Sequence, residues 1–293
     1  MSWLKFAFLT ILAAESALAV PNVLAWGEYW DGQRYVSAEV SADLEDAIAV
    51  SAGWGHSLAL KSDGTVIAWG SNFCGQTDVP SGLDHIVQIA AGDSHSLALR
   101  ADGSLVAWGG NDLGQTTIPA GLDDVVAIGV GDAHSLALRR NGTVVAWGWN
   151  ERDQIEIPKD LGNVVAIAAG GDHSAALRGD GVIIAWGGVR DAQYKRYLPG
   201  RWTDVVAIAT GTHHGLALRE NGRVEAWGEN RFGQTDVPDE VLTNVVAIAA
   251  GGDQSFALRQ DGSLVAWGDT TNGVTTFPEF PLGASGLTVG KSQ

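Results

Sequence analysis

The sequence has little of several features that mark whole classes of protein. Its 293 residues include one cysteine, Cys74, so no internal disulfide can form. Lys and Arg number 18 against 34 Asp and Glu, and the net charge of −16 argues against non-specific binding to nucleic acid. The sequence also lacks a nucleophile elbow, a zinc-protease helix motif and a phosphate-binding loop. We therefore expect no enzyme activity, no cofactor and no metal site.

Long hydrophobic runs are missing as well. The apolar stretch near the N-terminus, residues 6–14, is too short to span a membrane. It follows Lys5 and precedes Ala-Leu-Ala at residues 17–19, which is typical of a signal peptide cleaved after Ala19, with a buried helix as the alternative. We expect residues 1–19 to be removed and the protein to be secreted or periplasmic, with no membrane span.

The dominant feature of the sequence is a repeat. The tripeptide Ala-Trp-Gly occurs seven times, at intervals of 39 to 43 residues. Its tryptophans are Trp26, Trp69, Trp108, Trp147, Trp186, Trp227 and Trp267. A period of this length is typical of stacked supersecondary units.

Each repeat predicts a series of strands. Short runs rich in Val and Ile, such as residues 86–91 and 164–169, predict strands that are covered on both faces. The motif His-Ser-Leu-Ala-Leu predicts a second strand, and the segment ending in Ala-Trp-Gly predicts a third. Between them, Asp-Gly or Asn-Gly occurs in six repeats and predicts a two-residue type I′ turn.

After the tryptophan, the chain passes a Gly-Gln pair and reaches an apolar-Pro pair such as Val79-Pro80, which we interpret as a fourth, edge strand. Four antiparallel strands in about forty residues predict a propeller blade. We therefore expect an all-β, seven-bladed β-propeller with four-stranded blades. Its repeat units are expected at about 46–80, 85–119, 124–158, 163–199, 204–238 and 244–278.

The two ends of the chain look like parts of one unit. The first Ala-Trp-Gly lacks two preceding strands, and the last residues resemble the start of a repeat. We expect residues 286–293 and 23–37 to share a closing blade, which would pair two exposed sheet edges. No segment supplies the His-Ser-Leu-Ala-Leu strand of that blade, which suggests that the natural chain continues beyond Gln293. Residues 20–293 otherwise form one domain.

The order Gly-x-x-His-Ser-Leu-Ala-Leu, Asp-Gly, Ala-Trp-Gly, Gly-Gln resembles the repeat of the regulator of chromosome condensation family. The resemblance covers essentially all of residues 20–293 and implies a seven-bladed propeller. The compact units are similar to those of bacterial secreted members, including the propeller-type β-lactamase-inhibitory protein.

The resemblance leaves the function open, because members of one fold do different things. The nuclear founder of the family is an exchange factor for a small GTPase and binds chromatin, using inserted elements that this sequence lacks. The β-lactamase inhibitor uses aromatic residues in the loops between the first and second strands. At those positions this sequence has only one aromatic residue, Trp54.

Two recurrent residue types are expected to be structural. The Ala-Trp-Gly tryptophans are expected in the core. The histidines of Gly-x-x-His cannot share a metal ion, because equivalent positions in different blades are spread around a ring. We expect these histidines to bond to loop backbone. They are His56, His95, His134, His173 and His214, with Gln at the same position in the remaining units.

Aromatic residues outside the repeat pattern are candidates for binding a partner. The loop after the first strand and the loop after the third emerge on the same face of an antiparallel blade, so aromatic residues there would form one exposed patch. The alternative is that these rings pack on their own loops. The candidates are Tyr29, Trp30, Trp54, Phe73 and Trp149.

Charged residues add two further candidate surfaces. Carboxylates in the same loops would give this face an acidic rim that suits a basic partner; they are Asp93, Asp132, Asp172 and Asp253. The segment after Trp186 is unusually basic and aromatic, and would form a secondary patch for an anionic ligand or glycan, or else a solvated loop. Its residues are Arg190, Lys195, Arg196, Arg201 and Trp202.

From the sequence we thus expect an exported, monomeric, non-catalytic scaffold that binds a protein partner through one propeller face. A protein inhibitor of a secreted enzyme, using the same face, is the first alternative. A regulator of a small GTPase, similar to a guanine nucleotide exchange factor, is the second.

Overall fold

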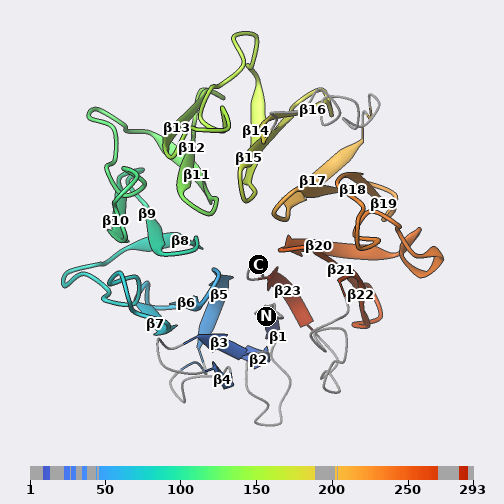
Figure 1. The fold of residues 1–293 in the computed structure, drawn as a ribbon, viewed down its shortest axis with the longest axis horizontal. Coiled ribbons are helices and arrows are strands. Elements are labelled where there is room, and N and C mark those ends of the chain that lie inside the picture. Colours follow the sequence, from blue (N-terminus) through green and yellow to red (C-terminus); the bar gives the residue numbers. More distant parts are fainter. Residues whose placement is uncertain are drawn as a thin grey trace.

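The chain folds into β-sheets arranged around a central axis (Figure 1). The computed structural model describes residues 44, 46–188, 202 and 204–269, together with the backbone of five further strands. Apart from one turn of 3-10 helix, η2 (Asp239–Val241), every element in these regions is a strand. The expected all-β fold is confirmed.

Six three-stranded antiparallel sheets contain the repeat. In each sheet the Val/Ile run is the strand nearest the axis, His-Ser-Leu-Ala-Leu is the central strand, and the strand ending in Trp-Gly is outermost (Figure 1). The sheets are β5–β7 (Ala47–Ala52, His56–Lys61, Val66–Gly70), β8–β10 (Ile86–Ala91, His95–Arg100, Leu105–Gly109), β11–β13 (Val125–Val130, His134–Arg139, Val144–Gly148), β14–β16 (Val164–Ala169, His173–Arg178, Ile183–Gly187), β17–β19 (Val205–Thr210, His214–Arg219, Val224–Gly228) and β20–β22 (Val245–Gly251, Gln254–Arg259, Leu264–Gly268).

A further three-stranded sheet joins the two ends of the chain. Its outer strands are β23 (Ala284–Val289) and β2 (Val23–Trp26), and its central strand is β1 (Leu9–Ala13), which pairs antiparallel with both. This sheet lies between β20 and β5 (Figure 1). The predicted signal peptide therefore contains the strand for which the sequence analysis found no source. Residues 1–8 and 14–22 lie outside the described residues.

A short hairpin follows β2. It consists of β3 (Glu28–Trp30) and β4 (Tyr35–Ser37), which form a separate two-stranded sheet. The expectation that Tyr29 and Trp30 lie in a loop is wrong, because their backbone is in β3.

The predicted fourth strand is wrong. Every residue between β7 and β8 is described, and none is in a strand. Side chains there bind backbone N–H groups that a fourth strand would have used for pairing. Gln76 Oε1 accepts a hydrogen bond from the Cys74 N–H at 2.9 Å, and Asn72 Oδ1 accepts one from the Thr77 N–H at 2.9 Å. The loops after β10, β13 and β19 form the same bonds through Gln115, Gln154 and Gln234.

The turn between the second and third strands also differs from the prediction. A type I′ turn needs positive φ at both central residues, but of Asp63 and Gly64 only Gly64 has it, at 84°. The Gly64 N–H donates to the Lys61 carbonyl at 2.9 Å, and the Lys61 N–H donates to the Thr65 carbonyl at 2.9 Å. These bonds define a three-residue loop that ends in a left-handed glycine. The other five hairpins repeat this pattern.

The hydrophobic core lies between neighbouring sheets. The alanine of His-Ser-Leu-Ala-Leu has 0% exposure in all six sheets. Leu58 and Leu60 of one central strand pack against Ile86 and Trp108 of the next sheet, and this contact recurs around the ring. The core role of the repeat tryptophans is confirmed for Trp108, Trp147, Trp186, Trp227 and Trp267. Trp69 is half-buried and packs against the core, and the side chain of Trp26 lies outside the described part.

A backbone carbonyl joins each sheet to the next. The carbonyl oxygen of Gln76, in the loop after β7, accepts hydrogen bonds from Ser96 Oγ and from Trp108 Nε1, both at 2.9 Å. Both donors belong to the next sheet, β8–β10. Gln115 and Gln154 receive the same pair of bonds from the sheets that follow them. The recurrent Gly-Gln and Ala-Trp-Gly motifs therefore form one joint between sheets.

The Gly-x-x-His histidines extend this joint. His56 Nε2 lies 2.9 Å from Ser96 Oγ. Because Ser96 gives its single proton to Gln76, His56 must donate the proton of this bond. His95, His134 and His214 make the same contact to a serine of the next sheet. The expectation of a structural role is confirmed: these four histidines contact a serine side chain, and His173 contacts the Thr212 carbonyl.

Replacing Ser96 by Ala removes two hydrogen bonds from a buried joint. We expect this variant to lose about 2 kcal/mol of unfolding free energy, because the His56 ring is left without its acceptor. Urea denaturation measures this loss. Ser104→Ala is the control, since its hydroxyl bonds to Asp102 on the exposed surface, and it should change stability by less than about 0.5 kcal/mol. Equal losses of unfolding free energy in the two variants would show that the Ser96 hydrogen bonds do not stabilise the contact between sheets.

The buried histidines make stability dependent on pH. Burial lowers the pKa of both His56 and His214 from 6.5 to about 3. Below pH 6.5 the unfolded chain binds protons that the folded chain does not, so stability is lost on acidification between about pH 6.5 and pH 3. The two residues together should account for about 3 kcal/mol per pH unit over the middle of this range. Urea titrations at pH 7, 6 and 5 measure the slope.

A natural replacement supplies the control for this prediction. Gln254 stands at the histidine position in β21 and is equally buried, so His56→Gln should fold and should reduce the slope. Ser104→Ala should leave the slope unchanged, because it removes a hydroxyl group that does not titrate in this range. An unchanged slope in the His56 variant would show that another group causes the acid sensitivity.

Candidate functional site

The loops on one face of the ring form a continuous rim. We use the term loop rim for the loops between the first and second strands and the loops that follow the third strands. Adjacent first loops are joined by backbone hydrogen bonds: the Trp54 N–H donates to the Gly92 carbonyl at 3.3 Å, and the Asp93 N–H to the Asp132 carbonyl at 3.2 Å. The Thr212 N–H donates to the Gly252 carbonyl at 2.9 Å in the same way. These bonds hold the rim residues at fixed spacing.

Two of the predicted aromatic residues are exposed on the loop rim. Trp54 is 42% exposed in the loop between β5 and β6, and Phe73 is 66% exposed in the loop after β7. Trp149 is half-buried, and its backbone N–H donates to the Ala133 carbonyl at 2.9 Å. The side chains of Tyr29 and Trp30 lie outside the described part. Trp54 and Phe73 are therefore exposed aromatic residues from loops of one sheet, and Phe232, in the loop after β19, is a third on the loop rim at 37% exposure.

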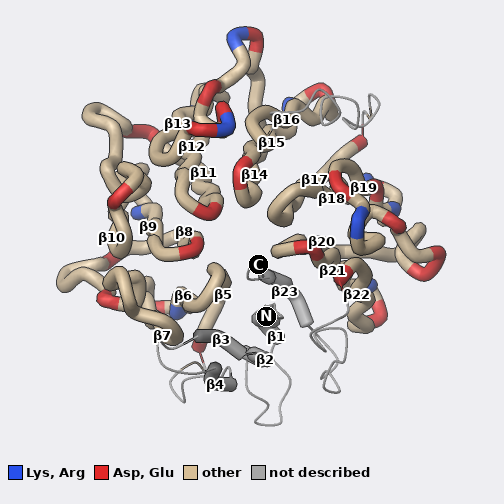
Figure 2. The backbone as a smooth tube through the Cα atoms, in the orientation of Figure 1, with Lys and Arg blue, Asp and Glu red and all other residues tan. Residues whose placement is uncertain are grey.

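The predicted acidic residues are also on the loop rim, but they differ from one another. Figure 2 shows acidic positions at the inner ends of β8, β11 and β14, near the axis. Asp93, Asp132 and Asp253 are half-buried. Asp172 is only 5% exposed and forms ion pairs with Arg152 and His213, so it offers no net charge to a partner. The expectation that Asp172 contributes to an open acidic rim is wrong, because two neighbouring loops supply its counter-charges.

The cluster around Asp172 perturbs two titrations. Burial would raise the pKa of Asp172, but the hydrogen bond and charge of His213, with His173 and Arg152, hold it below its usual value. The hydrogen bond from Asp172 raises the pKa of His213 against the opposing effect of burial, and Glu229 and Asp253 add to the rise. His213 Nδ1 and Arg152 Nη1 each lie 3.1 Å from an Asp172 oxygen. Sequence reasoning missed this cluster, since Arg152 and His213 are 61 residues apart.

The predicted basic patch is largely outside the described residues. Arg190, Lys195, Arg196 and Arg201 belong to that part of the chain. Trp202 is described, and it packs against the core cluster of Leu177, Val205 and Trp227. It is therefore a partly buried core residue, and the expectation of a ligand-binding ring at this position is corrected.

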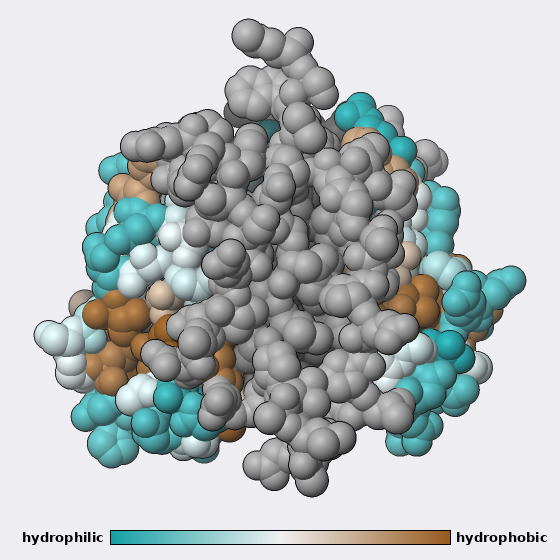
Figure 3. Space-filling view, turned by 90° about the horizontal axis from the view of Figure 1, so that it is seen from below, coloured by the Kyte–Doolittle hydropathy of each residue, from teal (hydrophilic) through white to brown (hydrophobic). Residues whose placement is uncertain are grey.

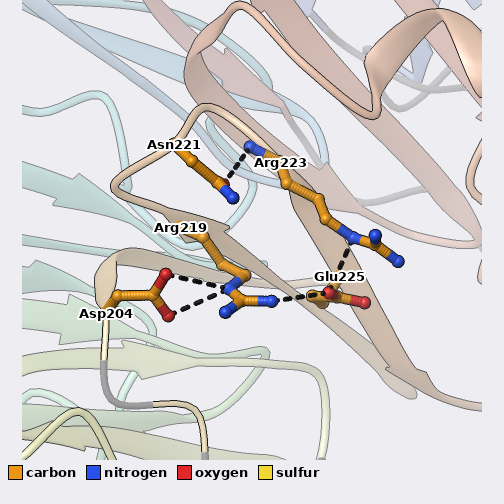
Figure 4. Close-up of polar contacts among 5 residues, drawn as sticks. All are labelled: Asp204, Arg219, Asn221, Arg223 and Glu225. Carbon is orange, nitrogen blue, oxygen red and sulfur yellow. Dashed lines mark hydrogen bonds and ion pairs between the residues drawn. The ribbon is translucent and has the colours of Figure 1, made fainter.

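The opposite face of the ring contains the hairpins and balances its own charges. Each central strand ends in a cation, and each cation has a carboxylate within 4 Å. In the β17–β19 sheet, Arg219 Nε bonds to both oxygens of Asp204 at 2.9 and 3.2 Å, and Glu225 joins Arg219 to Arg223 (Figure 4). These exposed pairs contribute little to stability, but they reduce the net charge of this face.

A row of exposed aliphatic residues lies beside these cations. Each is the second residue of a first strand, where a β-bulge shifts the register. The residues are Ile48, Val87, Val126, Val165, Val206 and Val246, with exposures from 40 to 56%. Sequence reasoning missed this row because an apolar run does not show where a bulge falls. Seen from the side, the described surface at the left and right of the view has hydrophobic patches among hydrophilic residues (Figure 3).

The described part of the chain contains neither a metal-binding cluster nor a membrane-spanning helix. No group of three or more His, Cys, Asp or Glu side chains there is placed to hold a metal ion. No helix in that part is long and apolar enough to cross a membrane.

Comparison with family models explains the repeat. The regulator of chromosome condensation (RCC1) repeat matches residues 47–76, 86–115, 125–154, 205–234 and 245–274, about half of the chain. The chain belongs to the RCC1 repeat family. Four of the five RCC1 matches end at the glutamine whose carbonyl joins two sheets. The β14–β16 sheet has the same three strands without a match of its own.

Solved structures show the same fold at low sequence identity. The ectodomain of the receptor kinase CR4 from Physcomitrella patens has a TM-score of 0.69 and 22% identity, over 82% of this chain and 68% of that one. Prp20p from Saccharomyces cerevisiae, studied for its binding to Gsp1p and histones, has a TM-score of 0.68 and 20% identity, over 97% and 85%. The ACR4 ectodomain from Arabidopsis thaliana has a TM-score of 0.66 and 19% identity, over 96% of both chains. No curated protein matches the sequence.

Replacing Asp172 by Asn removes the carboxylate that holds Arg152 and His213. We expect the pKa of His213 to fall, because its main hydrogen-bond acceptor loses its charge. NMR titration of the His213 ring measures this change. Asp112→Asn, in the loop after β10, is the control and should leave the His213 titration unchanged. An unaltered His213 pKa in the Asp172 variant would show that Asp172 does not raise it.

Proposed function

We propose that this RCC1-repeat chain is an exported, non-catalytic scaffold that binds a protein partner through the loop rim. The observation that carries the proposal is the exposure of Trp54 and Phe73 on the loop rim. Tryptophan is frequent among the residues that dominate the energy of protein–protein binding, and neighbouring exposed aromatic residues form a surface that suits a partner.

The proposed architecture is a closed ring of seven blades. The six repeat sheets supply six blades, and the sheet of β23, β1 and β2 supplies the seventh. The position of that sheet between β20 and β5 supports closure. A closed ring suits a scaffold, because the loops of all blades then form one rigid surface.

The fold neighbours support a protein partner. Prp20p was studied for its binding to Gsp1p and histones, and the same protein, yeast RCC1 (Prp20), was solved bound to Kap60; the receptor-kinase ectodomains are further neighbours. These proteins share only the fold with this chain, so the partner must be inferred from the site itself. The net charge of −16 and the carboxylates of the loop rim, apart from Asp172, favour a partner with a basic surface.

Substitution of Trp54 by Ala tests the proposed surface. Immobilised wild-type protein should retain a partner from the extracellular fraction of the source organism, and Trp54→Ala should weaken this binding by at least about tenfold. Val165→Ala removes an exposed apolar residue from the opposite face of the ring and should have little effect. Raising the salt from about 0.05 to about 0.5 M should weaken binding to a basic partner. Equal retention by all three proteins would overturn the assignment of the surface.

The identity of the retained protein separates two functions. If it is a secreted enzyme whose activity falls on binding, the chain is an inhibitor that uses the loop rim. If it has no activity to inhibit, the scaffold function stands. Sequencing the N-terminus of the extracellular protein tests export independently, with Val20 expected as the first residue.

A further inference from the structure

The closing sheet differs from the other six in the origin of its central strand. In the six repeat sheets, all three strands are continuous in sequence. In the closing sheet, β1 is inserted between β2 and β23, which come from opposite ends of the chain. Without β1, neither of these outer strands has a hydrogen-bonded partner in the sheet. They would leave an opening one strand wide, with unpaired N–H and C=O groups on both sides.

The register of β1 matches that of the repeat. Leu9 pairs with Trp26, as Ser57 pairs with Trp69 in the first repeat sheet. By this register Ile11 stands at the position of Ala59. The opening therefore has the geometry of a repeat sheet from which the His-Ser-Leu-Ala-Leu strand is missing.

The sequence of β1 fits this position poorly. The residue equivalent to Ile11 is alanine in all six repeat sheets, and each of these alanines has 0% exposure. Ser or Gly stands where β1 has Leu9. Five of the six repeat sheets use a serine hydroxyl there, and four of those serines donate to a glutamine carbonyl. A Ser-Leu-Ala-Leu strand would suit the position better than Leu-Thr-Ile-Leu.

The expected processing site lies between β1 and β2. Cleavage after Ala19 falls after the end of β1 at Ala13 and before the start of β2 at Val23. An exported chain processed there would lose the covalent link to its central strand. That the position of β1 becomes empty depends on the export proposed above. That this position prefers a Ser-Leu-Ala-Leu strand depends only on the register.

We propose that the space between β2 and β23 is a strand-binding site. It accepts an extended segment of a partner protein with the Ser-Leu-Ala-Leu pattern of the repeat, and β1 is a replaceable occupant. The segment pairs antiparallel with both outer strands, so it gains main-chain hydrogen bonds along both of its edges. This site lies in the sheet itself and is separate from the aromatic surface of the loop rim.

Strand exchange in the full chain tests the proposal. A recognition sequence for a specific protease is inserted between β1 and β2, and the folded protein is cut. The probe is a fluorescent peptide with the sequence of residues 132–141, which includes β12. We expect the cut protein to release its N-terminal fragment, detected by mass spectrometry, and to bind the probe, detected by fluorescence anisotropy. The uncut chain should bind it at least about tenfold more weakly, because its own strand competes at high effective concentration.

Matched peptides test the chemistry of the site. The Ala137→Ile peptide should bind at least about tenfold more weakly, and the Leu136→Pro peptide should not bind, because proline removes an N–H and disrupts pairing. A peptide with the sequence of residues 6–15 should bind more weakly than the probe. Equal binding by all peptides, equal binding to cut and uncut protein, or no binding to folded cut protein would overturn the proposal.

A second measurement applies if the cut protein unfolds. In the uncut chain, Ile11→Ala should raise the thermal midpoint because alanine is the residue of the repeat, and Ile11→Pro should lower it. An unchanged midpoint in both variants would exclude β1 from the sheet and overturn the proposal. Failure of export is distinguishable, because it would appear as an intact N-terminus while peptide exchange still occurred.

Discussion

The carbonyl group of the loop glutamine is the interaction on which the assembly of the sheets depends. Backbone pairing holds each sheet together internally, but it does not continue from one repeat sheet to the next. At the joint, Gln76 presents its carbonyl oxygen to a serine hydroxyl and an indole N–H of the following sheet. The two donors fix the distance and rotation between sheets, while the apolar faces supply most of the free energy.

The joint before the β17–β19 sheet lacks the serine donor and shows how neighbouring residues adjust. Gly215 replaces the serine in the β17–β19 sheet, and a Cβ there would lie 2.2 Å from the Trp227 ring. The preceding histidine, His173, has no serine to meet and lies with Nδ1 3.1 Å from the Thr212 carbonyl. The Asp172 cluster lies in the loops of the same neighbouring sheets, and in it an aspartate, an arginine and a histidine connect these loops. Charged side chains thus connect the sheets where the repeat departs from its usual residues.

Rigid joints determine what the loop rim can display. In the described part of the chain, five of the six first loops donate a backbone hydrogen bond to the next one, so exposed residues such as Trp54 stand on a surface that loses little entropy when a partner binds. The closing sheet is different, because its strands come from both ends of the chain. The loop rim and the proposed strand-binding site between β2 and β23 would give one scaffold two ways to bind a protein.

The sequence by itself determined the repeat, the identity of the three strands in each sheet and the core role of the tryptophans. These features depend on local residue patterns that recur with a fixed period. It could not determine that the segment after each tryptophan is a loop, because the glutamine and asparagine bonds that replace pairing depend on their three-dimensional positions. For the same reason, the burial of Asp172 and Trp202, the exposure of the bulged valines and the insertion of β1 were decided only by tertiary structure. The burial of Asp172 and Trp202 and the insertion of β1 depend on contacts between residues far apart in sequence, and such contacts leave no periodic signal.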